Sequence, residues 1–379
     1  MKKHQKHTAL TKPSGGRYHR NELGFIGAPC GTIQSLCSEI NKSLSKKYLL
    51  GYMDADHGDG DSTLDYNVAY TDKIKFHRID FHDNHTEYSL RSKFESCDVL
   101  MVNANHFIAH KQFVIINSKK EESLYRKLDR LTNVRAIILD EGMNAPFDFI
   151  ASHIDDIQKI PFVPIDDLNT ISRIIEEEIN ANVPTLNGLL LHGGKSSRMG
   201  KDKGEIEYHG IPQVDYLFEI LNSHCEKTYW SVSGRLDESS KENSIVDTFT
   251  GLGPFGGILS AFRYDPNCAY LSIPCDVPFI DESLIRNLIE HRDTSKVATC
   301  FHNKETDFPE PLITIWEPKA YSRLLYFLSL GYSCPRKVLI NSDIKEIDPP
   351  HELSLFNANT PEESEFAVKK LAAIRPSEN

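Results

Sequence analysis

A glycine-rich segment in the second half of the chain has the composition of a phosphate-binding loop. In LLLHGGKSSRMGKDKG (residues 189–204) an apolar run leads into Gly193-Gly194 and then into a loop with several cationic side chains. Glycines after a strand let backbone N–H groups approach phosphates closely, and lysine and arginine supply the compensating positive charge. Because neither the Walker pattern nor G-x-G-x-x-G fits, the segment predicts a phosphate site of another kind.

A single aspartate follows a second apolar run, IPCDVPFI at residues 273–280. Asp276 is expected at the carboxyl end of a buried strand, which is where open α/β sheets bind their ligands. A carboxylate that faces phosphates requires a divalent cation between them. The alternative is a helix N-cap, but Asp281 is better placed for that role. We therefore predict that Asp276 binds a metal ion.

Three further polar residues are open to two interpretations each. Asp247 precedes Thr-Phe-Thr-Gly and is either a turn residue or a nucleotide contact. Asn357 and Asn359 in FNANTPEE (356–363) are either turn formers or two amides directed into one pocket, because alternate residues of a strand share one side.

In chain order, these motifs resemble those of the molybdenum cofactor guanylyltransferase (MobA) family. The resemblance rests on G-G-x-S-x-R-M-G-x-D-K, GLGPFGGILSAF (251–262), IPCDVPFI and FNANTPEE, and it extends over residues 186–372. It implies a Mg²⁺-dependent nucleotidyltransferase of molybdenum cofactor biosynthesis, which transfers GMP from GTP to molybdopterin. The products would be molybdopterin guanine dinucleotide and pyrophosphate.

The resemblance also implies roles for individual residues. Lys203, Arg198 and Asp276 would be catalytic, with Asp276 as the ligand of Mg²⁺ and the two cations neutralising phosphate charge. Two positions depart from the family pattern, because His192 replaces a small residue and Ser233 stands where the family often has asparagine. The residues expected to bind the nucleotide are Leu191, His192, Gly193, Gly194, Lys203, Ser233, Asp247, Asp276, Asn357 and Asn359.

Two other functions stay open at this point. A cytidylyl- or sugar-nucleotide transferase of the same fold would use the same glycine loop, and a non-catalytic nucleotide- or cofactor-binding adaptor would use it without turnover. The motif region contains no Ser-His-Asp or Cys-His constellation, so catalysis there would rest on positioning and charge. Arg336 and Lys337 match a basic segment that either meets the phosphate of the pterin or begins a solvated helix.

Apolar runs alternate with longer amphipathic stretches along the chain, which predicts α/β architecture with mainly parallel sheets. The linker NANVPT (180–185) places a domain boundary near residue 183. We expect a basic disordered leader at residues 1–21, a P-loop-like parallel α/β domain at 22–180 and a Rossmann-like nucleotidyltransferase fold at 186–372. The expected strands lie within residues 22–27, 47–55, 98–104, 112–116, 134–140, 186–194, 227–234, 268–276, 296–301 and 311–316.

The first domain has the outline of a P-loop in GFIGAPCGTIQSL (24–36) but lacks the Walker lysine. Thr32 and Ile33 stand where lysine and then serine or threonine are needed, and Pro29 removes one backbone N–H from any phosphate cradle. The arrangement loosely resembles the GTP-binding partner (MobB) family, with Asn103 and Asn105 in place of an acid. We therefore expect this domain not to hydrolyse GTP or ATP.

Composition limits the remaining possibilities. The 379 residues carry a net charge of −11, which disfavours broad nucleic-acid binding. Eight cysteines occur singly without CxxC, which disfavours zinc and a disulfide framework, and no apolar stretch approaches the roughly 18 residues of a membrane span. We expect a cytoplasmic protein whose partners are GTP, molybdopterin and molybdoenzyme or chaperone acceptors, with no nucleic acid and no membrane.

Overall fold

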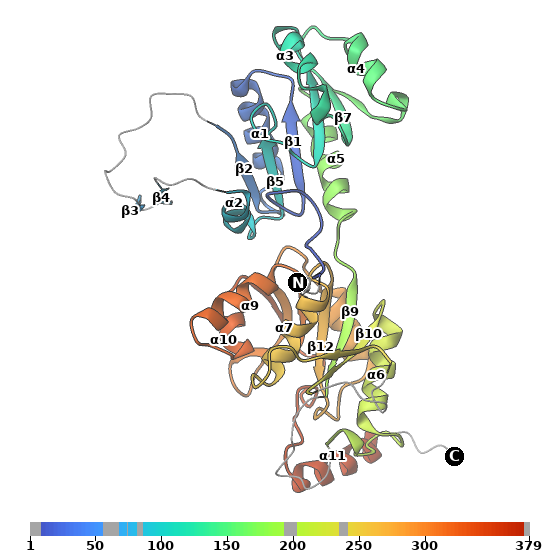
Figure 1. Ribbon diagram of the computed structural model, residues 1–379. Coiled ribbons are helices and arrows are strands. Elements are labelled where there is room, and N and C mark those ends of the chain that lie inside the picture. Colours follow the sequence, from blue (N-terminus) through green and yellow to red (C-terminus); the bar gives the residue numbers. More distant parts are fainter. Residues whose placement is uncertain are drawn as a thin grey trace, which may run out of the picture. The chain divides into compact units, whose positions relative to one another are not determined.

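The computed structural model describes residues 9–55, 68–73, 75–81, 86–192, 203–234 and 242–374. The chain forms two compact units, residues 14–183 and residues 184–379, the latter together with residues 1–13. Each unit has its own β-sheet with helices packed on it (Figure 1). The predicted α/β class with mainly parallel sheets is confirmed.

The N-terminal unit contains a six-stranded sheet in the order β2-β5-β1-β6-β7-β8, in which every neighbouring pair is parallel. β1 and β5 are buried along their whole length, as expected for strands covered on both faces. The strands are β1 (Glu22–Ile26), β2 (Leu50–Met53), β5 (Val99–Asn103), β6 (Lys111–Ile116), β7 (Val134–Leu139) and β8 (Phe162–Pro164), and a separate antiparallel hairpin pairs β3 (Val68–Asp72) with β4 (His77–Phe81).

Helices cover both faces of this sheet because successive residues of a strand point to opposite sides. Phe25 of β1 packs in one core with residues of α1 and α5, whereas Ile26 packs in the other with Leu124 and Ile150. The α-helices are α1 (Cys30–Leu44), α2 (Glu87–Phe94), α3 (Glu121–Tyr125), α4 (Asp148–His153) and α5 (Leu168–Asn180), and short 3₁₀ helices are η1 (Ser118–Lys120), η2 (Leu128–Arg130) and η3 (Ile157–Lys159).

The C-terminal unit contains a seven-stranded sheet in the order β11-β10-β9-β12-β14-β13-β15. Its neighbouring strands are parallel except for β14, which runs antiparallel to β12 and β13. The strands are β9 (Leu186–Leu191), β10 (Thr228–Val232), β11 (Ser244–Val246), β12 (Ala269–Pro274), β13 (Ala298–Asn303), β14 (Phe308–Trp316) and β15 (Ile344–Ile347).

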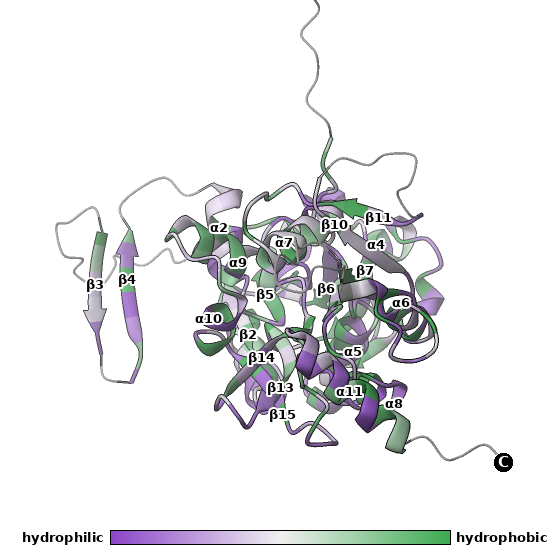
Figure 2. Cartoon of the chain, turned by 90° about the horizontal axis from the view of Figure 1, so that it is seen from below, coloured by the Kyte–Doolittle hydropathy of each residue, from purple (hydrophilic) through white to green (hydrophobic). Residues whose placement is uncertain are grey.

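Two helical layers enclose the second sheet. Residues of α7, α9 and α10 pack in one core, and residues of α6 and α8 pack in the other. In Figure 2, α6 and α11 carry both hydrophilic and hydrophobic residues, as expected for helices with one face against a core. The helices are η4 (Lys203–Glu205), α6 (Gln213–His224), α7 (Pro254–Tyr264), α8 (Glu282–Glu290), α9 (Ala320–Ser329), α10 (Pro335–Ile340) and α11 (Pro361–Ile374). Among the described residues, no helix is long and apolar enough to cross a membrane.

The expectation of a disordered leader is wrong for residues 14–21. Tyr18 and His19 are buried, with 9% and 7% of their surfaces exposed. The carboxylate of Glu22 accepts the backbone N–H groups of Tyr18 at 2.7 Å and His19 at 3.3 Å, and it also accepts the N–H of His110 at 2.9 Å. These bonds hold the segment on the N-terminal unit, a role that its basic composition does not reveal.

A buried ion pair joins two loops of the C-terminal unit. Arg292 donates from Nε to Oε1 of Glu317 at 2.6 Å and from Nη2 to Oε2 at 3.0 Å, and Nη2 also donates to the carbonyl of Pro184 at 2.8 Å. Only 1% of the Glu317 side chain is exposed. Removing one partner of such a pair leaves a buried charge without compensation.

We therefore expect Arg292→Met to lower the free energy of unfolding by about 3 kcal/mol. The matched control is Arg286→Met, which breaks an exposed pair with Glu282 and should cost about 0.5 kcal/mol or less. The two tryptophans of the chain, Trp230 and Trp316, both lie in this unit, so urea unfolding followed by their fluorescence reports on it alone. Equal losses in the two variants would contradict the expectation.

Candidate functional site

The predicted site residues that the structure describes lie at one edge of the C-terminal sheet. In the parallel registers, Leu191 at the end of β9 pairs with Ser231 of β10 and Pro274 of β12, and Val232 pairs with Val246 of β11. The residues that follow these strand ends include His192, Ser233, Asp247 and Asp276. They therefore share the carboxyl edge, where open α/β sheets bind ligands.

At this edge the strand order reverses between β9 and β12, and open α/β sheets bind their ligands at such a reversal. His192 directly follows β9, and Asp276 is the second residue after β12. The predicted Gly193, Gly194 and Arg198 lie outside the described residues. Lys203 is described only as the first residue of η4.

Asp247 is held by a serine that the sequence analysis did not single out. Ser231 Oγ donates to Asp247 Oδ1 at 2.8 Å, and the backbone N–H of Asp247 donates to the carbonyl of Val232 at 2.9 Å. Burial raises the pKa of the Asp247 carboxyl, and the bond from Ser231 opposes that rise. Ser231 therefore favours the charged form of an acid at the rim of the site.

A glycine of α7 makes room for this pair. A Cβ at Gly257 would lie 2.5 Å from Ser231 Oγ, closer than side chains approach one another. Only glycine lets α7 pack at this distance from β10. A sequence signal for Ser231 exists in hindsight, namely a small polar residue on a strand opposite the glycines of residues 251–257.

The loop after β12 carries Asp276 and is fixed from outside. Gln213 is fully buried, and its Nε2 donates to the carbonyl of Val277 at 3.0 Å. His209 Nε2 lies 2.9 Å from the carbonyl oxygen of Pro278. Asp281 accepts the N–H of Leu284 at 2.8 Å and is the N-cap of α8, as predicted. The capping role is thus filled by Asp281, which leaves Asp276 for another function.

A second buried acid lies in the electrostatic neighbourhood of Asp276. Glu310 of β14 is 6% exposed, and its carboxylate accepts the N–H of Leu312 at 3.3 Å and Nδ2 of Asn303 at 3.5 Å. Burial raises the pKa of Glu310, the charge of Asp276 raises it further, and Arg336 opposes the rise. The two acids are therefore close enough for the charge of one to act on the other.

Segment 356–363 meets the loop after β12 through its backbone. The N–H of buried Ala358 donates to the carbonyl of Asp276 at 2.9 Å, and Asn357 and Asn359 on either side of Ala358 are exposed. Glu363 accepts the N–H groups of Asn359 and Thr360, and Thr360 Oγ1 accepts the N–H of Glu363 at 3.3 Å. Part of the motif is therefore a capping box for α11.

The imidazole ring of His192 has one nitrogen that is not hydrogen-bonded within the described residues. Its Nδ1 is buried and has no hydrogen-bond partner within the described part of the chain, and the ring meets Trp230 edge-on with centroids 5.9 Å apart. Ser233 is exposed beyond the end of β10.

The described residues contain no group of three or more His, Cys, Asp or Glu side chains that could hold a metal ion. A cation bound at this edge would therefore take some of its ligands from outside the described protein residues, for example from phosphate oxygens.

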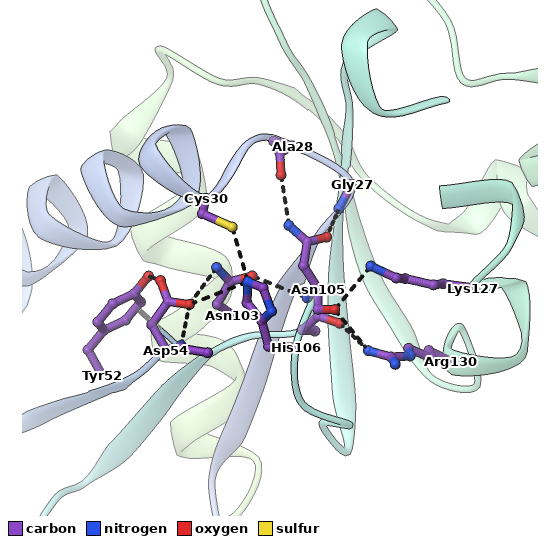
Figure 3. A network of polar contacts seen from close by, with 12 residues as sticks. Gly27, Ala28, Cys30, Tyr52, Asp54, Asn103, Asn105, His106, Lys127 and Arg130 are labelled. Atoms are coloured by element: carbon purple, nitrogen blue, oxygen red, sulfur yellow. Dashed lines mark hydrogen bonds and ion pairs between the residues drawn. The ribbon is translucent and has the colours of Figure 1, made fainter. Parts of the chain in front are cut away.

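In the N-terminal unit, an asparagine side chain of the same unit hydrogen-bonds to the backbone of the P-loop-like turn. Asn105 Oδ1 accepts the N–H of Gly27 at 3.3 Å, and its Nδ2 donates to the carbonyl of Ala28 at 2.8 Å (Figure 3). Lys127 donates to the carbonyl of Asn105 at 3.0 Å, and Arg130 donates to that of Ala104 at 2.9 Å. Backbone groups and cations that would meet a phosphate are thus engaged internally.

A match to a known protein family lies within the C-terminal unit. Residues 188–343 match the family model of the MobA-like NTP transferase domain. A molybdenum cofactor biosynthesis bifunctional protein from Synechocystis sp. is 35% identical over 181 residues, which cover 47% of this chain and 52% of that protein. The chain thus matches about half the length of this relative.

Two further proteins illustrate the similarity. A molybdenum cofactor guanylyltransferase from Pseudomonas fluorescens is 29% identical over 197 residues, covering 48% of this chain and 94% of that protein. The crystal structure of molybdopterin-guanine dinucleotide biosynthesis protein A from Archaeoglobus fulgidus covers 50% of this chain and 100% of its own, with 20% identity and a TM-score of 0.42.

The raised pKa of Glu310 predicts a pH-dependent effect on stability. A folded-state pKa above the unfolded value means that ionised Glu310 opposes folding at a pH above both values, and that this penalty disappears below both. Glu310→Gln should therefore raise the thermal midpoint relative to the wild type at pH 8, by about 2 °C or more, and leave it unchanged at pH 4. Glu282→Gln, on the exposed surface, is the control. A gain of equal size at both pH values would show that the effect is not electrostatic.

Proposed function

Because residues 188–343 match the MobA-like NTP transferase domain, we propose that this chain transfers GMP from GTP to molybdopterin. The products are molybdopterin guanine dinucleotide and pyrophosphate. The observation that supports the proposal is the position of Asp276 two residues after β12, whose last residue, Pro274, pairs with Leu191 at the end of β9. In the sequence the glycine-rich segment follows β9, so the proposal has an acid and a phosphate-binding sequence at the ligand-binding edge of the sheet.

In this proposal the protein supplies position and charge rather than a nucleophile. The terminal phosphate of molybdopterin attacks the α-phosphate of GTP, and pyrophosphate leaves. Lys203 and Arg198 neutralise negative charge on the phosphates. Asp276, with Glu310 near it, would hold Mg²⁺, which when bound stabilises charge on the phosphate oxygens.

The remaining residues bind and orient the nucleotide. Ser231 positions the Asp247 carboxylate through its 2.8 Å hydrogen bond, so that Asp247 can accept from the nucleotide. Gln213 and His209 keep the loop after β12 in place through the carbonyls of Val277 and Pro278. The nucleotide contacts in this proposal are Leu191, His192, Gly193, Gly194, Lys203, Ser233, Asp247, Asp276, Asn357 and Asn359.

A transfer assay tests the proposed reaction directly. The full chain is incubated with molybdopterin, Mg²⁺ and each of the four NTPs labelled at the α-phosphate, and the dinucleotide and pyrophosphate are separated. We expect product with GTP alone. Product with CTP alone would make the chain a cytidylyltransferase. Nucleotide binding without product in any reaction would make it an adaptor.

Neutralising Asp276 should remove most of the activity. We expect Asp276→Asn to lower the rate of GMP transfer by about 100-fold or more, since a neutral amide binds a divalent cation poorly. Asp281→Asn is the matched control, because asparagine caps a helix as well as aspartate and the change removes the same charge nearby. Tryptophan fluorescence checks folding in both variants. Equal rates for Asp276→Asn and wild type at low Mg²⁺ would exclude Asp276 as the metal ligand.

A further inference from the structure

A cysteine, a histidine and an aspartate meet at the carboxyl edge of the N-terminal sheet, outside the site discussed above. Cys30 is the first residue of α1, His106 follows β5, and Asp54 follows β2. Cys30 Sγ lies 3.1 Å from His106 Nε2, and Asp54 Oδ1 lies 3.9 Å from the same nitrogen (Figure 3). All three side chains are half-buried.

The carboxylate in this group is firmly placed. The hydroxyl of Tyr52 donates to Asp54 Oδ2 at 2.6 Å, and Asn103 Nδ2 donates to Asp54 Oδ1 at 2.8 Å. Asp54 therefore presents its carboxyl group to His106 in a fixed position.

Cys30 has the surroundings of a nucleophile. A histidine within hydrogen-bond distance can accept the thiol proton as sulfur attacks. Burial affects three other thiols instead. Burial raises the pKa of Cys37 and Cys300, and it raises that of Cys225 to about 12.

We propose that Cys30 is a site of thiol–disulfide exchange with a low-molecular-weight disulfide. Cys30 Sγ forms a bond to one sulfur of the disulfide, the original S–S bond breaks, and the other sulfur leaves with the electron pair as a thiolate. The proton of Cys30 passes to His106 Nε2. The product is a mixed disulfide on Cys30, and a second thiol reverses the reaction.

The geometry favours this reaction over acyl transfer. In acyl-transfer triads the acid binds the second ring nitrogen and orients the histidine, which then protonates the leaving group. Here Asp54 and Cys30 approach the same nitrogen, Nε2. A leaving sulfur departs as an anion and needs no proton, so a histidine that only accepts the proton is sufficient.

Cys334 provides an internal reference for the test, because it is exposed and unbridged. The full chain is treated with glutathione disulfide at pH 7, quenched at intervals and mapped by peptide mass spectrometry. We expect the mixed disulfide to form on Cys30 at least about ten times faster than on Cys334, although Cys30 is less exposed. A rate on Cys30 equal to or below that on Cys334 would overturn the proposal.

A variant of the histidine separates activation from simple accessibility. His106→Asn should lower the rate on Cys30 at least about ten-fold and leave that on Cys334 unchanged. The control is the same substitution at the exposed His153 of α4, which should change neither rate. An unchanged rate on Cys30 in a folded His106→Asn variant would overturn the role of His106. If circular dichroism shows that variant to be unfolded, the wild-type comparison of Cys30 with Cys334 decides.

Discussion

The register of β9 between two parallel neighbours is the constraint on which the C-terminal site depends. Because Leu191 pairs with both Ser231 and Pro274, the residues that follow three separate strands reach one edge. A shift of one residue in the pairing of β10 with β9 would turn Ser231 to the opposite face of the sheet and away from Asp247. The buried leucines of β9 that hold the strand in register therefore also determine where the polar groups meet.

At the same edge, acidic side chains are partly removed from solvent. Asp247 and Glu310 both have pKa values raised by burial, and Asp276 adds to the rise at Glu310. Acids with pKa values shifted in this way cluster at functional sites. In the N-terminal unit, the side chain of Asn105 hydrogen-bonds to the backbone of the P-loop-like turn at Gly27 and Ala28.

Much of this arrangement was predictable from local patterns, and the remainder depends on tertiary packing. Apolar runs predicted ten of the strands in the described part of the chain, but not β3, β4, β8, β11 and β15. Asp281 was expected to cap a helix and does so in α8, whereas the metal-binding role of Asp276 stays a prediction. Ser231 and Glu310 were missed because their burial follows from the close approach of α7 and from packing around β14 rather than from any motif. Cys30, Asp54 and His106 follow three different strands, so only the strand order brings them together.

The backbone of Asp276 is supported by a residue late in the C-terminal unit, because the N–H of Ala358 donates to its carbonyl. Every strand of the sheet precedes residue 348, yet this backbone partner of Asp276 comes later. During synthesis the ribosome, which covers the most recent part of the chain, therefore still holds residue 358 when the last strand emerges. Asp276 therefore gains this hydrogen bond only after the sheet itself is able to form.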